Sequence, residues 1–228
     1  MFIDAKTDIG STRSENQDNF WSTVCTIDGV ETGIVCVCDG MGGLEDGGHA
    51  SRMVIESIRD AVKSGVGLDS LVNVILKVNA EIYNMCSQGK RMGTTCTILY
   101  CQNNEYTIYH VGDSRCYKVD IDGSVYLLST DHSVVRKYGI TKQNNPELYE
   151  KYKSKLTNCI GVTPTVSVDT YRGNYSKGDT FILCSDGFWH SFDDNMCSMN
   201  LRDLCGCINT CINCGETDNI TVSLLQIN

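Results

Sequence analysis

Residues 33–43 have the sequence GIVCVCDGMGG, in which an apolar run meets an acidic, glycine-rich turn. The run GIVCVC has the β-branched content of a buried strand. The turn after it places Asp39 at the strand end, and its glycines let the backbone bend sharply and approach a ligand closely. This stretch therefore predicts a sheet with an acidic side chain at one edge.

Three further acidic fragments lie beside strand-like runs: Glu15-Asn16-Gln17-Asp18, Ser185-Asp186-Gly187 and Thr217-Asp218-Asn219. Because strand ends from distant parts of a chain converge at one sheet edge, we expect these Asp side chains to gather around Asp39. Carboxylates at short range stay ionised together only when a cation neutralises them. Oxygen ligands suit hard divalent ions such as Mg²⁺ or Mn²⁺. The pattern predicts a metal centre and metal-assisted hydrolysis.

The composition narrows the class of protein. The chain has 228 residues, enough for one large domain, and its net charge is −9, from 19 Lys and Arg against 28 Asp and Glu. This charge argues against nucleic-acid and anionic-membrane partners. The first residues have no secretory signal pattern, and no apolar run approaches a bilayer span. We expect a single domain over residues 1–228, a monomer in the cytoplasm.

The chain contains 14 cysteines. Cys36, Cys38, Cys96 and Cys184 lie inside apolar runs, which is typical of cysteine used as a small buried hydrophobe in a reducing compartment. A second group has two interpretations, the apolar face of a helix or a structural metal or iron–sulfur site, and comprises Cys205, Cys207, Cys211 and Cys214. No cysteine is followed by five residues and an Arg, as a cysteine-nucleophile tyrosine phosphatase would require.

Hydrophobic periodicity predicts an α+β domain with sheets between helices. Strands are expected near 19–27, 31–38, 94–101, 105–111, 115–120, 124–128, 165–171, 179–184 and 219–227, and helices near 47–63, 68–88 and 199–214. Asn103-Asn104 and Asp122-Gly123 have the composition of hairpin turns, so we expect an antiparallel meander between residues 94 and 128.

Residues 133–163 are polar and charged, with one or two short helices expected from about Pro146. They form either a plain surface excursion or a mobile flap beside the active site. Arg13 lies five residues before Asp18 and also has two interpretations. It is either an exposed turn residue or the group that holds a phosphoryl anion beside the metal, since its planar fork donates to two oxygens.

A series of fragments occurs in the order and spacing of one known family: Thr7-Asp8-Ile9-Gly10, Arg13, Asn16-Gln17-Asp18, Cys38-Asp39-Gly40-Met41-Gly42-Gly43, Gly93-Thr94-Thr95, His110-Val111-Gly112-Asp113-Ser114-Arg115, Thr130-Asp131-His132-Ser133, Cys184-Ser185-Asp186-Gly187 and Asp218-Asn219. With them the chain resembles the metal-dependent protein phosphatases of type 2C, from about residue 6 to 227. It looks most like the compact bacterial Ser/Thr phosphatases of that family.

The resemblance implies two antiparallel β-sheets packed face to face and flanked by helices in α-β-β-α layers. It also implies two core Mg²⁺ or Mn²⁺ ions and a weaker third. Asp39, Asp186 and Asp218 would hold the first ion, and Asp18, Asp39 and the Gly40 carbonyl the second. Asp113, with Asp186, would hold the third. Arg13 would bind the substrate phosphate, and residues 133–163 would be the variable flap that influences substrate choice.

The implied activity is hydrolysis of phosphoserine and phosphothreonine in proteins by a metal-activated water, without a covalent intermediate. The substrates would be targets of a Ser/Thr kinase. Two alternatives stay open, a catalytically weak or silent relative that binds phosphoproteins, and a hydrolase of small phosphate esters. The chain departs from many relatives at Met41, where some have His, and at Gln17, where many have Glu. His110, His132 and His190 each have two interpretations, a structural role or a direct role in the chemistry.

Overall fold

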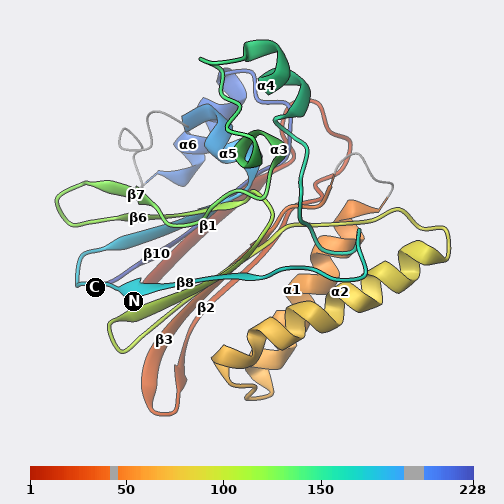
Figure 1. Cartoon of the computed structure of the whole chain (residues 1–228). Helices are drawn as coiled ribbons and strands as arrows, with labels where there is room; N and C mark the ends of the chain where they lie inside the picture. The colour runs from red at the N-terminus through yellow and green to blue at the C-terminus, as the bar shows by residue number, and fades with distance from the viewer. Residues whose placement is uncertain (42–45, 193–202) are drawn as a thin grey trace.

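The computed structural model describes residues 1–41, 46–192 and 203–228. The described residues form two five-stranded sheets, in which every strand pair is antiparallel (Figure 1). One sheet has the order β1-β10-β9-β6-β7, with bounds Phe2–Asp8, Ile220–Gln226, Thr180–Cys184, Arg115–Val119 and Val125–Leu127. The other has the order β2-β3-β4-β5-β8, with bounds Asn19–Ile27, Val30–Cys38, Cys96–Gln102, Glu105–Val111 and Asp169–Asn174.

Strand alternation sorts the apolar side chains into three layers. On β3, Val35 and Val37 point between the sheets, whereas Cys36 and Cys38 point to the outer helices. On β9, Phe181 and Leu183 likewise lie between the sheets. Because successive strand side chains face opposite ways, a strand that is apolar throughout serves two layers at once. The sequence GIVCVC is therefore buried on both faces.

Helices cover the outer faces of the sandwich, as Figure 1 shows. Helices α1 (Gly47–Lys63) and α2 (Leu71–Ser87) pack on one sheet, and a short 3-10 helix, η1 (Leu68–Ser70), precedes α2. Helices α5 (Asp186–Phe192) and α6 (Leu204–Asn213) pack on the other sheet. This is the predicted α-β-β-α layering. Among the described residues, every helix is too short or too polar to cross a bilayer.

The expected meander over residues 94–128 is wrong. Strands β4 and β5 pair through the Asn103-Asn104 turn, but β6 and β7 belong to the other sheet. The chain changes sheets at Gly112, whose φ of +110° favours glycine. A Cβ at Gly112 would lie 2.5 Å from Thr95 Cγ2, so a larger residue also has no room there. The Asp122-Gly123 turn joins β6 to β7, as predicted.

Other differences concern element bounds. Strand β8 begins at Asp169 rather than near residue 165, and neither β1 nor α5 was predicted. The predicted helix near 199–214 corresponds to α6, and residues 199–202 lie outside the described residues. Residues 133–163 contain two short helices, α3 (Val134–Lys137) and α4 (Pro146–Tyr152). Helix α4 begins at Pro146 as predicted, because the Asn145 side chain accepts from Leu148 N and caps it.

Candidate active site

Strand pairing brings the predicted acidic residues to one end of the sandwich. The register pairs Asp8 with Ile220, Asn19 with Cys38 and Cys96 with Val111, so these strand ends lie at the same edge. Four carboxylates follow or precede those ends, namely Asp18, Asp39, Asp113 and Asp218, and a fifth, Asp186, follows the end of β9 at Cys184. The pKa of Asp39 lies well above its usual range, because of burial and then the charges of the other four. The structure therefore brings all five together.

Asp18 carries an oxygen without a partner. Its Oδ2 accepts from Ser185 Oγ at 2.7 Å, whereas its buried Oδ1 has no hydrogen-bond donor among the described residues. Burial, followed by the charges of Asp186 and Asp218, raises the pKa of Asp18 to about 7. A buried carboxylate oxygen without a donor is costly unless a cation or proton satisfies it. The residues present thus fit a cation held by oxygen ligands.

The Asp39-Gly40-Met41 turn is held by the Gly93-Thr94-Thr95 segment. Asp39 N donates to Thr95 Oγ1, and Asp39 O accepts from Thr95 N and Thr94 Oγ1, each at 2.9 Å. A Cβ at Gly40 would lie 2.5 Å from the Gln17 carbonyl oxygen, so only glycine allows this approach. These contacts explain why the turn needs glycine and why two threonines oppose it across the sheet. They fix the backbone of Asp39 beside that of Gln17.

Arg13 lies at the rim of the acidic site. Its Nη2 pairs with Asp218 Oδ2 at 2.6 Å, and both side chains are about one-third exposed, 37% and 32%. Burial alone would lower the pKa of Arg13, but Asp218, then Asp186 and Asp39, outweigh it and raise that pKa. Arg13 is therefore a charged group facing both the carboxylates and solvent.

Asn219 joins the two acidic loops. Its Oδ1 accepts from Gln17 N at 2.9 Å, and its Nδ2 donates to the carbonyls of Ile9 and Glu15 at 2.8 and 3.0 Å. Sequence reasoning noted Asn219 only as the neighbour of Asp218. The four hydrogen-bonding capacities of an amide were the available signal, but their partners lie about 200 positions away. Asn219 thus positions the loop that carries Arg13 and Asp18.

Asp113 is the carboxylate of the acidic site that follows β5. Burial, followed by the charge of Asp186, raises its pKa well above the usual range. Its carbonyl accepts from Trp189 Nε1 at 2.9 Å, and the Arg115 guanidinium stacks 3.4 Å from the centre of that ring. Arg115 also donates to both oxygens of Asp131 at 2.7 to 3.2 Å. Trp189 was not predicted as a site residue, yet it supports the Asp113 loop.

Two histidines near the site have structural partners. His132 Nδ1 accepts from Gly112 N at 3.1 Å and faces Asn158 Nδ2 at 2.9 Å, while its Nε2 lies 3.2 Å from Asp169. His110 is fully buried, with Nδ1 2.9 Å from Thr97 Oγ1. Burial, followed by the charge of His132, lowers the pKa of His110 to about 4. His132 therefore holds the turn before Asp113 at Gly112, and His110 joins β5 to β4 through Thr97. His190 Nδ1 lies 3.8 Å from a Glu216 oxygen.

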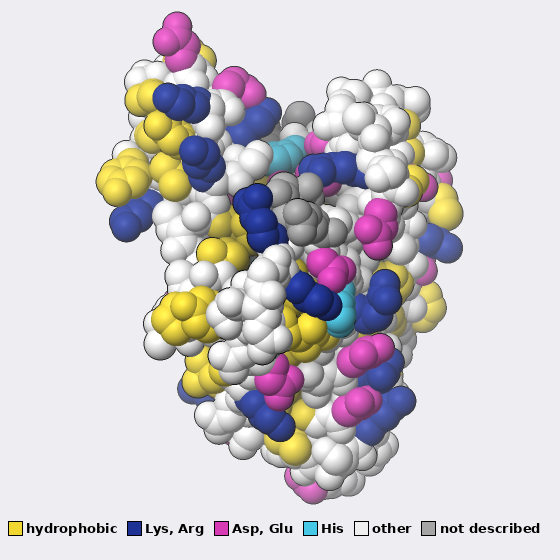
Figure 2. All heavy atoms as spheres, turned by 90° about the vertical axis from the view of Figure 1, so that its right-hand side faces the viewer, with side chains coloured by type: hydrophobic (Ala, Val, Ile, Leu, Met, Phe, Trp, Pro, Cys, Tyr) yellow, Lys and Arg dark blue, Asp and Glu magenta, His cyan; other side chains and the backbone are white. Residues whose placement is uncertain are grey.

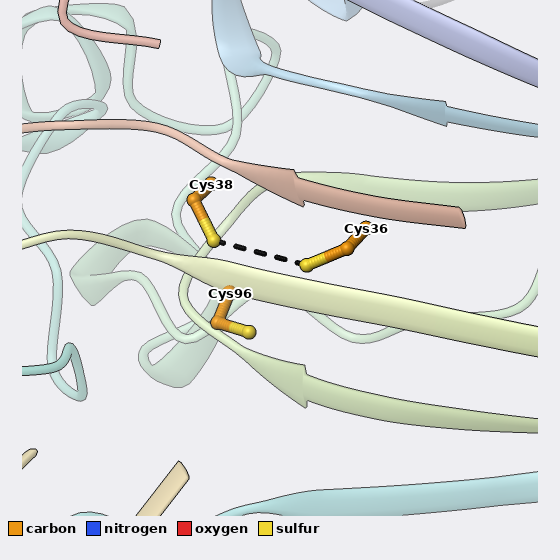
Figure 3. Close-up of side chains that lie close together, drawn as sticks. All are labelled: Cys36, Cys38 and Cys96. Carbon is orange, nitrogen blue, oxygen red and sulfur yellow. Dashed lines mark hydrogen bonds between the residues drawn. The ribbon is translucent and has the colours of Figure 1, made fainter. Parts of the chain in front are cut away.

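The cysteines do not supply the chemistry. Figure 3 shows Cys36, Cys38 and Cys96 side by side on β3 and β4, and the sulfurs of Cys36 and Cys38 are 4.0 Å apart. Among the described residues this is the only trio of Cys, His, Asp or Glu with ligand atoms all within 4.8 Å. All three are fully buried in the apolar layer under α1 and α2, as predicted for small hydrophobes. In the described part of the chain, no three carboxylates have oxygens that all lie within 4.8 Å of one another, so the carboxylates are spaced more widely than these three sulfurs.

The second cysteine group is divided by helix α6. Cys207 and Cys211 are buried against α5 and the sheet, whereas Cys205 and Cys214 are exposed. They do not converge on one point within the described residues. The apolar face of α6 therefore includes Cys207 and Cys211, whereas Cys205, which was expected on that face, lies outside it.

An acidic site of hard oxygen donors with an Arg at its rim, on an α-β-β-α sandwich, defines a metal-dependent phosphatase. Residues 11–219 match the family model described as protein phosphatase 2C. The chain is 32% identical over 204 residues to the serine/threonine phosphatase stp of Listeria innocua, covering 82% of this chain and 77% of that protein. It is 28% identical over 258 residues to protein phosphatase PhpP of Streptococcus pneumoniae, covering 100% and 98%.

The fold is also that of a solved phosphatase. The crystal structure of serine/threonine phosphatase Stp1 from Staphylococcus aureus matches with a TM-score of 0.85, covering 99% of this chain and 94% of that one. At 24% identity this likeness shows the fold alone. The chain belongs to the protein phosphatase 2C family, a metal-dependent family that acts on phosphorylated proteins.

Proposed function

We propose that this chain is a protein serine/threonine phosphatase that hydrolyses phosphoserine and phosphothreonine with the aid of divalent cations. The observation that carries the proposal is the convergence of four carboxylates on a fifth, Asp39, together with one buried oxygen of Asp18 that has no donor among the described residues. The Listeria and Staphylococcus proteins are serine/threonine phosphatases, which supports the same specificity here. A catalytically silent relative that only binds phosphoproteins would not need all five carboxylates.

The acidic set would hold Mg²⁺ or Mn²⁺. We assign Asp39, Asp186 and Asp218 to one core ion, and Asp18, Asp39 and the Gly40 carbonyl to a second. Asp113 and Asp186 would hold a third, weaker ion. Bound ions of this kind would lower the pKa of water to about 7, so that a nucleophile would be available at neutral pH. The unpartnered Asp18 oxygen and the raised pKa of Asp39 support this assignment.

The chain's own residues then bind and orient the phosphoryl group. Arg13 contacts Asp218 and therefore lies beside the acidic site. Its guanidinium fork can donate to two phosphoryl oxygens. In doing so it exchanges its bond to Asp218 for bonds to substrate. The described cysteines near the site, Cys36, Cys38 and Cys96, are fully buried, so a direct attack by water on phosphorus fits better than a thiol nucleophile. Met41 has no proton to give to the leaving alkoxide.

We also propose a cytoplasmic, monomeric, single-domain enzyme whose substrates are targets of a Ser/Thr kinase. The described cysteines form no disulfide with one another, which suits a reducing compartment. In this proposal residues 133–163 are a flap. Residues of the flap line one cavity together with Asp113 and Trp189.

The test is a phosphatase assay on matched phosphoserine, phosphothreonine and phosphotyrosine peptides with Mg²⁺, Mn²⁺ or chelator. We expect release of phosphate from the first two peptides with either ion and none with chelator. Asp39→Asn should lower kcat by at least about 10²-fold, because a neutral amide cannot balance cations. The control is Asp122→Asn, which changes a carboxylate in the exposed β6–β7 turn. Wild-type rates in Asp39→Asn would exclude the mechanism.

The role of Arg13 has its own test. Arg13→Ala should raise KM for phosphopeptides about 10-fold or more, since a charge-assisted pair of hydrogen bonds is lost. Arg59→Ala, which removes a guanidinium from α1 that is also about one-third exposed, is the matched control. An unaltered KM in Arg13→Ala would show that Arg13 does not bind the phosphoryl group.

A further inference from the structure

We propose that the cavity between the flap and the β6–α5 side of the active site is a second anion-binding site, which takes a carboxylate or a second phosphate on the same substrate protein. The inference rests on the proposed function and names the class of substrate. We call this space the flap cavity. It is lined on the flap by Arg136, Lys142, Tyr149 and Lys153 and on the body by Asp113 and Trp189, among others.

The flap cavity is large enough for a side chain and borders the acidic site at Asp113. Its volume is about 240 Å³, whereas one water takes about 30 Å³ in the liquid. Asp113, one of the five converging carboxylates, forms part of its wall. A group that enters the flap cavity therefore lies beside one of the carboxylates of the acidic site. A peptide with two anionic groups can reach both places.

Part of the charge in the flap cavity is already neutralised. Arg115 donates to both oxygens of Asp131, so this pair adds no net charge. Lys153 pairs with Glu150 at 2.6 Å. These two cations are occupied by carboxylates and are not the main attraction for a ligand.

Arg136 and Lys142 remain as the available cations. Both side chains are exposed, and neither has a carboxylate partner within 4.0 Å in the described part of the chain. Lys142 lies 5.4 Å from the Tyr149 ring centre, a contact that leaves its ammonium charge unneutralised. Arg136 can bind two oxygens of one anion in a fork, and Lys142 adds a point charge. Two unpaired cations beside one cavity suit a carboxylate or a phosphate dianion.

The charge of the whole chain makes the flap stand out. Residues 133–163 contain six Lys and Arg against two Glu, a net charge of +4. Because the whole chain has a net charge of −9, the remaining residues together carry −13. In Figure 2 several Lys and Arg side chains gather on the upper left lobe, beside the hollow between the two upper lobes. An acidic substrate is repelled by the body and attracted by the flap. The second anion should thus fix the orientation of the substrate.

The test compares phosphoserine peptides that differ in one flanking residue. One arm places Asp at successive positions on either side of the phosphoserine, a second arm places another phosphoserine there, and Ala serves as the neutral reference. The measured quantity is kcat/KM relative to the Ala peptide, for the wild type and for Arg136→Gln/Lys142→Gln. The control Lys137→Gln/Lys151→Gln removes the same charge from exposed flap residues that do not line the flap cavity.

We expect at least one register at which an anionic peptide exceeds the Ala peptide about 10-fold at low salt. The Arg136/Lys142 variant should lose this preference to within about 2-fold, and the control should keep it. The arm with the larger gain identifies carboxylate or phosphate as the preferred group. Equal rates for all peptides in the wild type, or an equal loss in both variants, would overturn the proposal.

Failure of the proposed function is separately visible. Hydrolysis of p-nitrophenyl phosphate, which carries no second anion, reports the chemistry alone. If the wild type does not hydrolyse it with either ion, the proposed function fails. Peptide affinity measured by fluorescence anisotropy on Asp39→Asn then still decides the flap cavity, because the same anionic preference and its loss in the Arg136/Lys142 background are expected in binding.

Discussion

Replacement of Asp18 by Asn should stabilise the metal-free protein while it removes activity. Asp18 is buried, and one of its oxygens has no hydrogen-bond donor among the described residues. An Asn at this position keeps an acceptor for Ser185 Oγ and carries no charge to bury. The ionised Asp therefore carries a cost in stability that a bound cation would offset.

The magnitude follows from the pKa of Asp18. In the folded chain it is about 7, against 3.8 for the free side chain. Three pH units at about 1.36 kcal/mol each give about 4 kcal/mol. Because the folded-state pKa is the higher one, the wild type has its full stability below about pH 4 and loses this amount as the pH rises to about 7. The Asn variant does not titrate, so its advantage grows over the same range.

The assay is urea unfolding of both proteins in chelator at pH 4, 5.5 and 8, followed by tryptophan fluorescence. Near-equal stability is expected at pH 4, and the variant should be more stable at pH 8 by about 4 kcal/mol, or roughly 8–16 °C in Tm for a chain of this length. With Mn²⁺ at 100 times its Kd, the wild type should regain about 2.7 kcal/mol and the variant less. An Asn variant that is no more stable than wild type at pH 8 in chelator would refute the reasoning.

Three further outcomes are expected. Gly10→Ala should cost at least about 1–2 kcal/mol and lower activity, because Gly10 has φ of +77° and a Cβ would meet the Asp218 carbonyl; chemical denaturation and peptide kinetics measure both. His132→Ala should cost about 1–3 kcal/mol, since two donors lose their acceptor; His132→Asn should restore part of this in thermal unfolding. Cys205→Ser/Cys214→Ser should change stability by less than about 0.5 kcal/mol and bind no less zinc than wild type, because both residues are exposed.

Much of the local structure could be predicted because its signal is local. The helices at 47–63 and 71–87 carry an apolar stripe on one face, and the Asn103-Asn104 turn has two residues with positive φ, 53° and 62°. Strand β1 was not predicted, since the segment FIDAKTD is mostly polar and half-exposed. It is a strand because it pairs with β10 over seven positions, from Phe2–Gln226 to Asp8–Ile220.

The candidate site also combines residues that the sequence predicts with residues that it does not. Acidic turns after apolar runs predict which residue types could hold a cation, and the structure brings Asp18, Asp39, Asp113, Asp186 and Asp218 together. The supports of these residues could not be predicted from spacing. Trp189 under Asp113 and Asn219 between two loops act through contacts with residues 76 and about 200 positions away. Such pairs leave no periodic pattern in the chain.

By itself the sequence determined the alternation of strands, the amphipathic helices and the kind of chemistry, because periodicity and residue type act over a few positions. Only the tertiary structure decided that the chain leaves one sheet for the other at Gly112, and that Arg13 meets Asp218. It alone placed the cations of the flap beside Asp113. The physical reason is that burial, charge and hydrogen bonding between distant segments depend on which surfaces pack together, and packing is a property of the whole chain.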